Sequence, residues 1–150
     1  MADVVDVPTR SRMMASIRGK NTRPELLVRK YLHSQGLRFR LNVRSLPGSP
    51  DLVLPRYHVA LFVHGCFWHR HQGCRFAYNP KSNAARWQTK FSENVQRDIA
   101  TQQQLVALGW RVLVVWECAL RASDRQLVLG ELADEIVLGG RQEACWPVST

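Results

Sequence analysis

The sequence has no hydrophobic run long enough to cross a bilayer, and its first residues lack the apolar core of a secretory signal. We therefore expect a cytoplasmic protein without a membrane partner. Cysteine is scarce, at four residues, and acidic residues number 12 against 21 lysines and arginines. In the cytoplasm thiols stay reduced, so clustered cysteines favour metal ligation over disulfides.

The shortage of acidic residues leaves a net charge of +9. A basic surface is typical of proteins that bind nucleic acid, and the five tryptophans could stack on bases. At 150 residues and 45% hydrophobic residues, the chain can bury a core of its own. We expect a single domain over residues 1–150, with residues 1–20 as a basic amino-terminal arm.

The hydrophobic periodicity predicts an α/β fold with a mixed sheet between helices. The segment 59–63 is apolar on both faces, so its strand should be central and covered on both sides. The apolar side chains Trp87, Phe91, Val95 and Ile99 recur every four residues along the second helix. The last helix should bury Leu127, Leu132 and Ile136, and the tail after it gives no signal. Helices are predicted over 22–36, 83–108 and 123–139, and strands over 37–41, 51–54, 58–64 and 111–116.

The first helix begins with clear local signals. Thr22 can cap it, Pro24 suits its first turn, and Glu25 stands three residues after the threonine, in capping-box position. Glu25 therefore has a structural explanation that competes with any catalytic role.

The run from His64 to Cys74 combines three histidines, two cysteines and two aromatics directly after the central strand. Cys66, His71 and Cys74 have the spacing of half a zinc site, and Cys118 at the end of the last predicted strand could complete it. Three thiolates and one imidazole form a closed shell, as in structural zinc sites. The competing interpretation is a set of buried thiols without a metal.

A closed zinc shell leaves two histidines free for chemistry. His64 ends the central strand, and His69 follows in the loop. Asp51 opens the strand that should pair with this central strand. Mg²⁺ prefers carboxylate oxygen, and imidazoles exchange protons near neutral pH. With the basic charge, this set predicts hydrolysis of phosphodiester bonds.

Three motifs agree with one known family. The most specific is Phe-Val-His-Gly-Cys-Phe-Trp-His at residues 62–69; Pro-Asp at 50–51 and Trp-Glu-Cys at 116–118 accompany it. Together they resemble the bacterial very-short-patch-repair (Vsr) DNA mismatch endonucleases, over residues 9–119. The resemblance implies a restriction-endonuclease-like fold and Mg²⁺-dependent nicking of duplex DNA, 5′ of the thymine in T·G mismatches left by deamination of 5-methylcytosine. It also implies a nucleoid-associated monomer, with mismatch-repair proteins as candidate partners.

The resemblance further implies roles for single residues. Asp51 would bind Mg²⁺ together with the backbone carbonyl of Val63. His69 would activate the water, His64 would assist the leaving group, and Glu25 and Asp98 would hold metal-bound waters. The structural zinc ligands would be Cys66, His71, Cys74 and Cys118.

The family pattern also implies contacts with DNA. Phe67, Trp68 and Trp87 match aromatics that wedge into the base stack beside the mismatch, where unstacking costs less than in matched DNA. Core packing is the competing explanation, and it suits Trp87 on its apolar stripe better than the pair in the polar loop. Met14 matches a residue that enters from the other groove, and Asn94 lies on the helix that faces DNA.

Two other functions compete with the nicking endonuclease. One is a non-catalytic, zinc-stabilised DNA-binding module, which needs the basic arm and the aromatics but not Asp51 or His69. The other is a zinc-dependent hydrolase in which His64, His69 and His71 hold one open catalytic metal, so that the cysteines would be dispensable.

Overall fold

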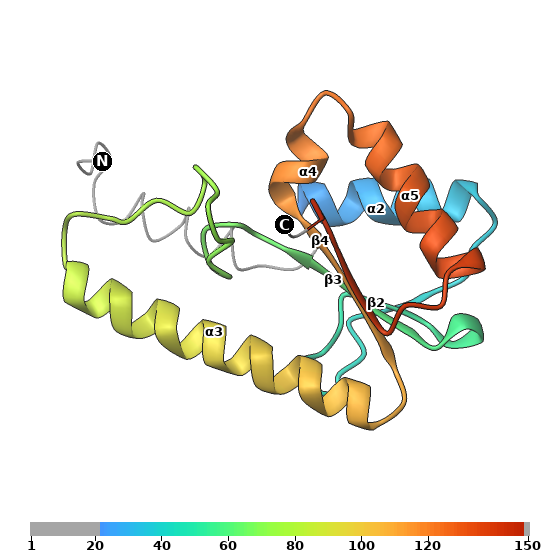
Figure 1. Ribbon diagram of the computed structural model, residues 1–150, viewed down its shortest axis with the longest axis horizontal. Helices are drawn as coiled ribbons and strands as arrows, with labels where there is room; N and C mark the ends of the chain where they lie inside the picture. Colours follow the sequence, from blue (N-terminus) through green and yellow to red (C-terminus); the bar gives the residue numbers. More distant parts are fainter. Residues whose placement is uncertain (1–21, 149–150) are drawn as a thin grey trace.

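The computed structural model describes residues 22–148, which form one mixed five-stranded sheet with helices on both faces (Figure 1). Met14 and the basic arm lie outside the described residues. The strands are β1 (Arg40–Leu41), β2 (Leu52–Leu54), β3 (Val59–His64), β4 (Arg111–Trp116) and β5 (Glu143–Trp146). The helices are α2 (Arg23–Ser34), α3 (Ala84–Ala107), α4 (Glu117–Arg121) and α5 (Arg125–Leu138), with the short 3₁₀ helix η1 (Pro55–Tyr57).

The strands lie in the order β1-β2-β3-β4-β5, with β3 in the centre as the sequence predicts. The first three strands pair antiparallel, and β3, β4 and β5 run parallel. The register places His64 beside Trp116 at the carboxyl ends of β3 and β4. Side chains that follow β3 and β4 therefore meet at one edge of the sheet, where the functional residues gather.

Each face of the sheet has its own core. On one face α2, α4 and α5 pack over the sheet and bury side chains such as Val28, Leu120 and Leu132 (Figure 1). On the other face α3 buries Leu105 against Ala60 and Val112. Both faces of β3 are therefore covered. Among the described residues, no helix is both long and apolar enough to cross a membrane.

The start of α2 follows the predicted local signals. The Thr22 hydroxyl accepts a hydrogen bond from the Glu25 N–H at 3.4 Å, and Pro24 lies in the first turn. After the helix, Gly36 takes a φ of +80°, which glycine adopts without strain. This cap fixes the position of Glu25, whose side chain points into the protein and is only 3% exposed.

Three details of the sequence prediction were wrong, and the tail, which gave no signal, forms a strand. Leu127 is 62% exposed, and Leu129 takes its place in the core. The tail forms β5, which buries Trp146 beside β4. The first strand spans only Arg40–Leu41 rather than residues 37–41. Ile99 is 50% exposed, because the apolar stripe of α3 meets the core mainly through Phe91 and Leu105.

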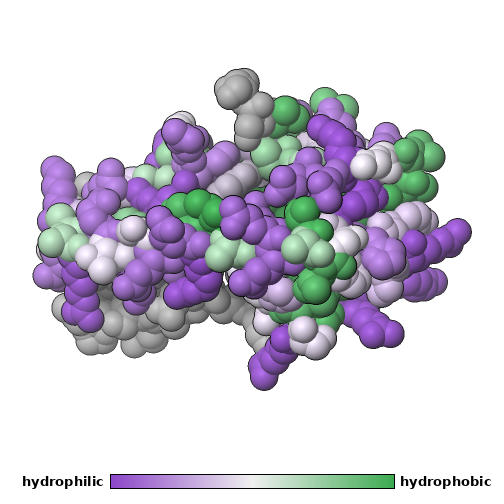
Figure 2. All heavy atoms as spheres, turned by 60° about the horizontal axis from the view of Figure 1, so that its bottom comes forward, coloured by the Kyte–Doolittle hydropathy of each residue, from purple (hydrophilic) through white to green (hydrophobic). Residues whose placement is uncertain are grey.

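Helix α3 extends well beyond the sheet at its amino-terminal end (Figure 1). There it packs on the loop that follows β3 instead of on strands, through Phe91. It carries the exposed cations Arg86, Lys90 and Arg97. Figure 2 shows this side of the molecule as mostly hydrophilic. A polyanion could approach α3 without covering a large apolar surface.

Candidate active site and metal centre

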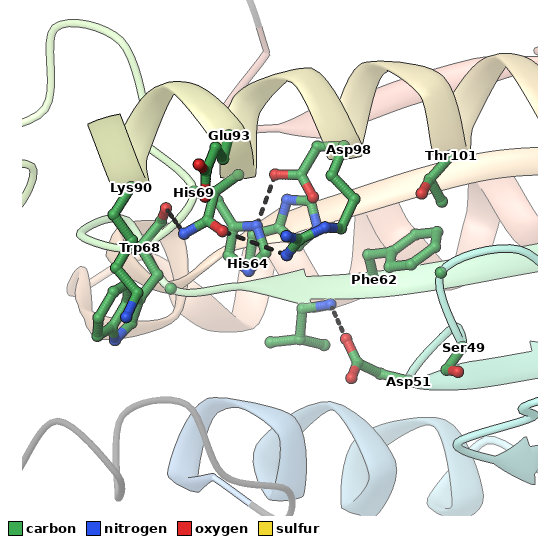
Figure 3. Close-up of a pocket in the computed structure, with 15 residues that line it drawn as sticks. Ser49, Asp51, Phe62, His64, Trp68, His69, Lys90, Glu93, Asp98 and Thr101 are labelled. Carbon is green, nitrogen blue, oxygen red and sulfur yellow. Dashed lines mark hydrogen bonds and ion pairs between the residues drawn. The ribbon is translucent and has the colours of Figure 1, made fainter. Parts of the chain in front are cut away.

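A cleft of about 440 Å³ opens at the carboxyl end of β3, between α3 and the loop that precedes β2 (Figure 3). Gly48 in this loop lies against Thr101 of α3, where an added Cβ would come within 2.3 Å of the threonine methyl group. A larger residue would push the loop away from α3. The predicted site residues that line the cleft are Asp51, Val63, His64, Trp68, His69, Asn94 and Asp98.

Asp51 stands at the start of β2, and its Oδ2 accepts a hydrogen bond from the Val63 N–H at 2.7 Å (Figure 3). Burial raises the pKa of this carboxyl from 3.8 to about 7, although the Val63 hydrogen bond acts in the opposite direction. The neighbouring Glu25 carboxylate raises the pKa further. Two close, buried carboxyls repel each other when both are ionised, so the pair favours a bound proton or a cation.

Glu25 reaches this position from α2. Its Oε1 lies 3.2 Å from Arg29, one turn later on the same helix. The predicted cap explains where the backbone of Glu25 lies, but the carboxylate itself is close enough to interact with Asp51. The structural and functional explanations of Glu25 therefore apply together.

The donor set around Asp51 suits a hard cation. Carboxylate and carbonyl oxygens are the protein ligands that Mg²⁺ takes, with waters completing its shell. An extended residue directs its N–H and C=O to the same edge of its strand. Since the Val63 N–H points to Asp51, its carbonyl faces the same side. Asp51 and Val63 thus fit the predicted magnesium ligands, with Glu25 close to Asp51.

His64 and His69 form a parallel stacked pair, with ring centroids 3.8 Å apart and planes within 3°. The Nδ1 atom of His69 lies 2.6 Å from Oδ2 of Asp98, which descends from α3 (Figure 3). This contact with the Asp98 carboxylate assigns the proton of the neutral His69 ring to Nδ1. Nε2 is then unprotonated and can act as a base. A histidine oriented by a carboxylate is the usual arrangement for proton transfer.

His64 is the buried member of the pair, at 4% exposure. Burial holds its pKa well below the ordinary value, and nearby His69 lowers it further. A neutral imidazole retains a single N–H, so His64 can donate one hydrogen bond to a leaving oxygen.

The atoms of His64, His69 and Asp98 lie within 4.8 Å of one another, close enough to be considered as ligands for one metal. However, an imidazole binds a metal in the plane of its ring. Two stacked parallel rings place their lone pairs in separate planes. One ring would have to turn before both could bind the same ion, so the observed arrangement favours acid–base chemistry.

Cys66, His71, Cys74 and Cys118 form a second group whose ligand atoms lie within 4.8 Å of one another. Nδ1 of His71 is 3.7 Å from the Cys66 sulfur and 3.4 Å from the Cys118 sulfur. Zn–S and Zn–N bonds of 2.3 and 2.0–2.1 Å in a tetrahedral shell place nitrogen and sulfur about 3.6 Å apart. The four side chains therefore match a closed zinc shell in type, number and spacing.

The surroundings of this cluster set the protonation and the orientation of its side chains. Burial raises the pKa of the Cys66 thiol and also that of Cys118, so without a metal both thiols stay protonated. The His71 ring stacks on Trp116, with centroids 4.3 Å apart and planes at 8°. Trp116 thereby holds the imidazole in an orientation that directs Nδ1 to the sulfurs. His71 consequently belongs with the thiols and not with His64 and His69, contrary to the three-histidine hydrolase.

Phe67 and Trp68 are buried, at 7% and 5% exposure, in a cluster with Phe91 and partly buried Trp87. The expectation that core packing suits Trp87 better than Phe67 and Trp68 was therefore wrong. Helix α3 projects far enough to cover their loop, which the sequence alone did not reveal. Of these rings, Trp68 borders the cleft and forms part of its wall, and Asn94 donates a hydrogen bond to the Trp68 carbonyl at 3.3 Å.

Comparison with known proteins agrees with this geometry. Residues 2–75 match the family model described as DNA mismatch endonuclease Vsr. The DNA mismatch endonuclease Vsr of Escherichia coli K12 is 45% identical over 125 residues, which cover 83% of this chain and 80% of that protein. This chain belongs to the Vsr family.

Other relatives are type II nicking enzymes. That of Xanthomonas oryzae pv. oryzae is 50% identical over 120 residues, covering 80% of this chain and 88% of the relative. The type II nicking enzyme of Neisseria meningitidis serogroup A is 44% identical over 121 residues, covering 81% of this chain and 86% of the relative. The likeness therefore extends over most of both proteins.

The sequence analysis of this Vsr family member missed Arg70. Its side chain donates hydrogen bonds to the backbone carbonyls of Phe67, Ala77 and Tyr78, all in the loop after β3. Nothing distinguishes it in the sequence, because it is one of 21 basic residues. The only local signal is its place inside the run from His64 to Cys74.

Proposed function

We propose that this protein is an Mg²⁺-dependent endonuclease that nicks duplex DNA 5′ of the thymine in a T·G mismatch. Membership of a mismatch endonuclease family supports the reaction class. The observation that carries the proposal is the His69–Asp98 contact of 2.6 Å in the same cleft as the Asp51 carboxyl. A base and a metal-binding carboxylate in one cleft are the groups that phosphodiester hydrolysis needs.

The two histidines have different roles in the reaction. His69 takes a proton from the attacking water at Nε2, and Asp98 stabilises the imidazolium that results. His64 stays neutral and donates a hydrogen bond to the leaving oxygen, which takes up a proton from solvent water, while His69 returns its proton to solvent. The stacked arrangement keeps both rings on the same side of β3.

Asp51 and the Val63 carbonyl would hold Mg²⁺, and Glu25 and Asp98 would orient its water ligands. Bound there, the ion would stabilise negative charge on the phosphate and acidify water. Cys66, His71, Cys74 and Cys118 would hold Zn²⁺. Because Cys118 lies 44 residues beyond Cys74 in sequence, this zinc would join the loop to the end of β4 and stabilise the wall of the cleft.

Duplex DNA would lie along α3, whose exposed cations can contact phosphates. Phe67, Trp68 and Trp87 would stack beside the mismatch, and Asn94 would face the DNA. Since Phe67 and Trp68 are buried without DNA, their rings must become accessible when it binds. Met14, outside the described residues, would enter from the other groove. This proposal includes a restriction-endonuclease-like fold and a single domain over residues 1–150.

The non-catalytic DNA-binding module is the main competing function. It gives no reason for a buried carboxyl pair next to an oriented histidine, because neither group is needed to bind phosphate. Family membership also favours catalysis over binding alone.

The test is a nicking assay with purified protein and Mg²⁺ on T·G, matched C·G and other mismatched duplexes in several flanking contexts. We expect a nick in the T·G duplex for the protein and none for Asp51→Ala, which should still bind the duplex. Equal cleavage of matched DNA, or full activity of Asp51→Ala, would remove the proposal.

A further inference from the structure

The guanidinium of Arg70 is the centre of a dense set of contacts in the loop after β3. Its Nη1 donates to the carbonyls of Phe67 and Tyr78 at 3.1 and 3.0 Å. Its Nη2 donates to the Ala77 carbonyl and to the Asn79 side chain, both at 2.8 Å. Each terminal nitrogen has two hydrogens, so all four are engaged.

The same group lies on the aromatic cluster. The guanidinium carbon is 3.8 Å from the centroid of the Phe91 ring, a stacking distance. Asn79 also accepts a hydrogen bond from Gln88 at 3.2 Å. Arg70 thus connects the Phe67 backbone, the segment 77–79 and α3 in one network.

These contacts require arginine in particular. Lysine carries a single nitrogen and could not donate to Phe67 and Asn79 in the same forked geometry or stack flat on Phe91. The terminal donors are already used within the protein. Arg70 is therefore not placed to neutralise DNA phosphates, unlike the exposed cations of α3.

We propose that Arg70 is a positioning residue for mismatch discrimination, which fixes the loop carrying Phe67 and Trp68 against α3. This inference rests on the proposed nicking function. Insertion of side chains into a base stack costs a few kcal/mol, and the cost is lower at a mismatch. The Phe67 and Trp68 rings can turn toward the DNA, but this difference in cost affects binding only if the backbone that carries them does not retract. If the loop could retract, the enzyme would act on matched and mismatched DNA with more similar efficiency.

The test compares Arg70→Lys with the unaltered protein through the ratio of kcat/KM on T·G duplex to kcat/KM on matched duplex. A merely structural role would lower the active fraction, which reduces both rates equally and leaves the ratio unchanged. Positioning predicts a ratio at least tenfold lower. Duplex carrying 2-aminopurine beside the mismatch should also show a smaller fluorescence rise, because the base is unstacked less.

Arg75→Lys is the matched control, since Arg75 is an exposed arginine in the same loop whose guanidinium contacts Phe76 instead. Its ratio should not change. If Arg70→Lys does not fold, the inference is tested with Asn79→Ala instead. This substitution removes one hydrogen-bonding partner of Arg70 at an exposed residue. We expect the ratio to fall, but by less than the tenfold predicted for Arg70→Lys.

An unchanged ratio in Arg70→Lys, or in Asn79→Ala where that variant decides, overturns the inference and leaves the nicking function standing. A protein that nicks T·G and matched DNA equally before any substitution overturns the proposed function, and this inference with it.

Discussion

Replacing Asp51 by asparagine should abolish nicking and also stabilise the protein at alkaline pH when no Mg²⁺ is bound. The reason is the environment of the carboxyl. Burial, followed by the nearby Glu25, raises the pKa of Asp51 from 3.8 to about 7. Asparagine keeps the shape and an oxygen to accept the Val63 N–H bond, but it carries no charge.

The size of the effect follows from the pKa. A folded-state pKa above the unfolded value means that the folded protein holds the proton more tightly. Ionised Asp51 therefore destabilises the folded state. This destabilisation grows as the pH rises from about 4 to about 7 and has its full size above that range. The change from 3.8 to about 7 corresponds to a ceiling of about 4 kcal/mol. Since Asp51 is partly exposed and its surroundings relax, we expect about 2 kcal/mol.

The assay is thermal unfolding in Mg²⁺-free buffer, without a chelator that would remove zinc. At pH 8 a gain of about 2 kcal/mol should raise the Tm of Asp51→Asn by roughly 4–8 °C. At pH 5 the gain should be clearly smaller, because Asp51 is then largely protonated. Mg²⁺ should stabilise the unaltered protein but not the variant.

Glu93→Gln is the matched control, because Glu93 is an exposed carboxylate that lines the same cleft. It should change the Tm little at either pH. A lower Tm for Asp51→Asn at pH 8, or the same gain at both pH values, would refute the reasoning.

Three further substitutions test the zinc cluster, the base and the aromatic cluster. Cys118→Ser should lose bound zinc and have a lower Tm, whereas Cys145→Ser should keep the zinc content and the Tm of the unaltered protein. Unchanged zinc content in Cys118→Ser would count against the cluster. Asp98→Asn should reduce kcat by roughly a hundredfold or more with little change in KM, because the His69 base loses its orienting carboxylate; a near-normal kcat would exclude that role. Trp68→Ala should lose about 3–5 kcal/mol of stability because the ring is buried, and it should also reduce preference for mismatched DNA. Lower stability with unchanged preference would identify Trp68 as a core residue only.

Much of the fold follows from local patterns. The apolar run 59–63 predicted a covered central strand, and β3 is one. Cysteine and histidine spacing predicted that four side chains would converge, and the structure brings them together from the loop and Cys118. Local patterns suffice here because a short stretch of sequence determines both the burial of a strand and the types of side chain available as metal ligands.

Other features depend on tertiary contacts that no short pattern encodes. The burial of Phe67 arises from the length of α3, and β5 exists because the tail can pair with β4. The hydrogen bonds of Arg70 depend on the return of residues 77–79 to the same place. The T·G specificity, the identity of both metals, the monomeric state and any mismatch-repair partner stay predictions.

Strand-resolved cleavage tests the central claim most directly. A T·G duplex labelled separately on each strand should be incubated with Mg²⁺ and the products sized beside a matched duplex. We predict a single Mg²⁺-dependent nick, 5′ of the mismatched thymine, with the other strand and the matched duplex intact. Cleavage of both strands, a nick elsewhere, or nicking that persists in Asp51→Ala would contradict it.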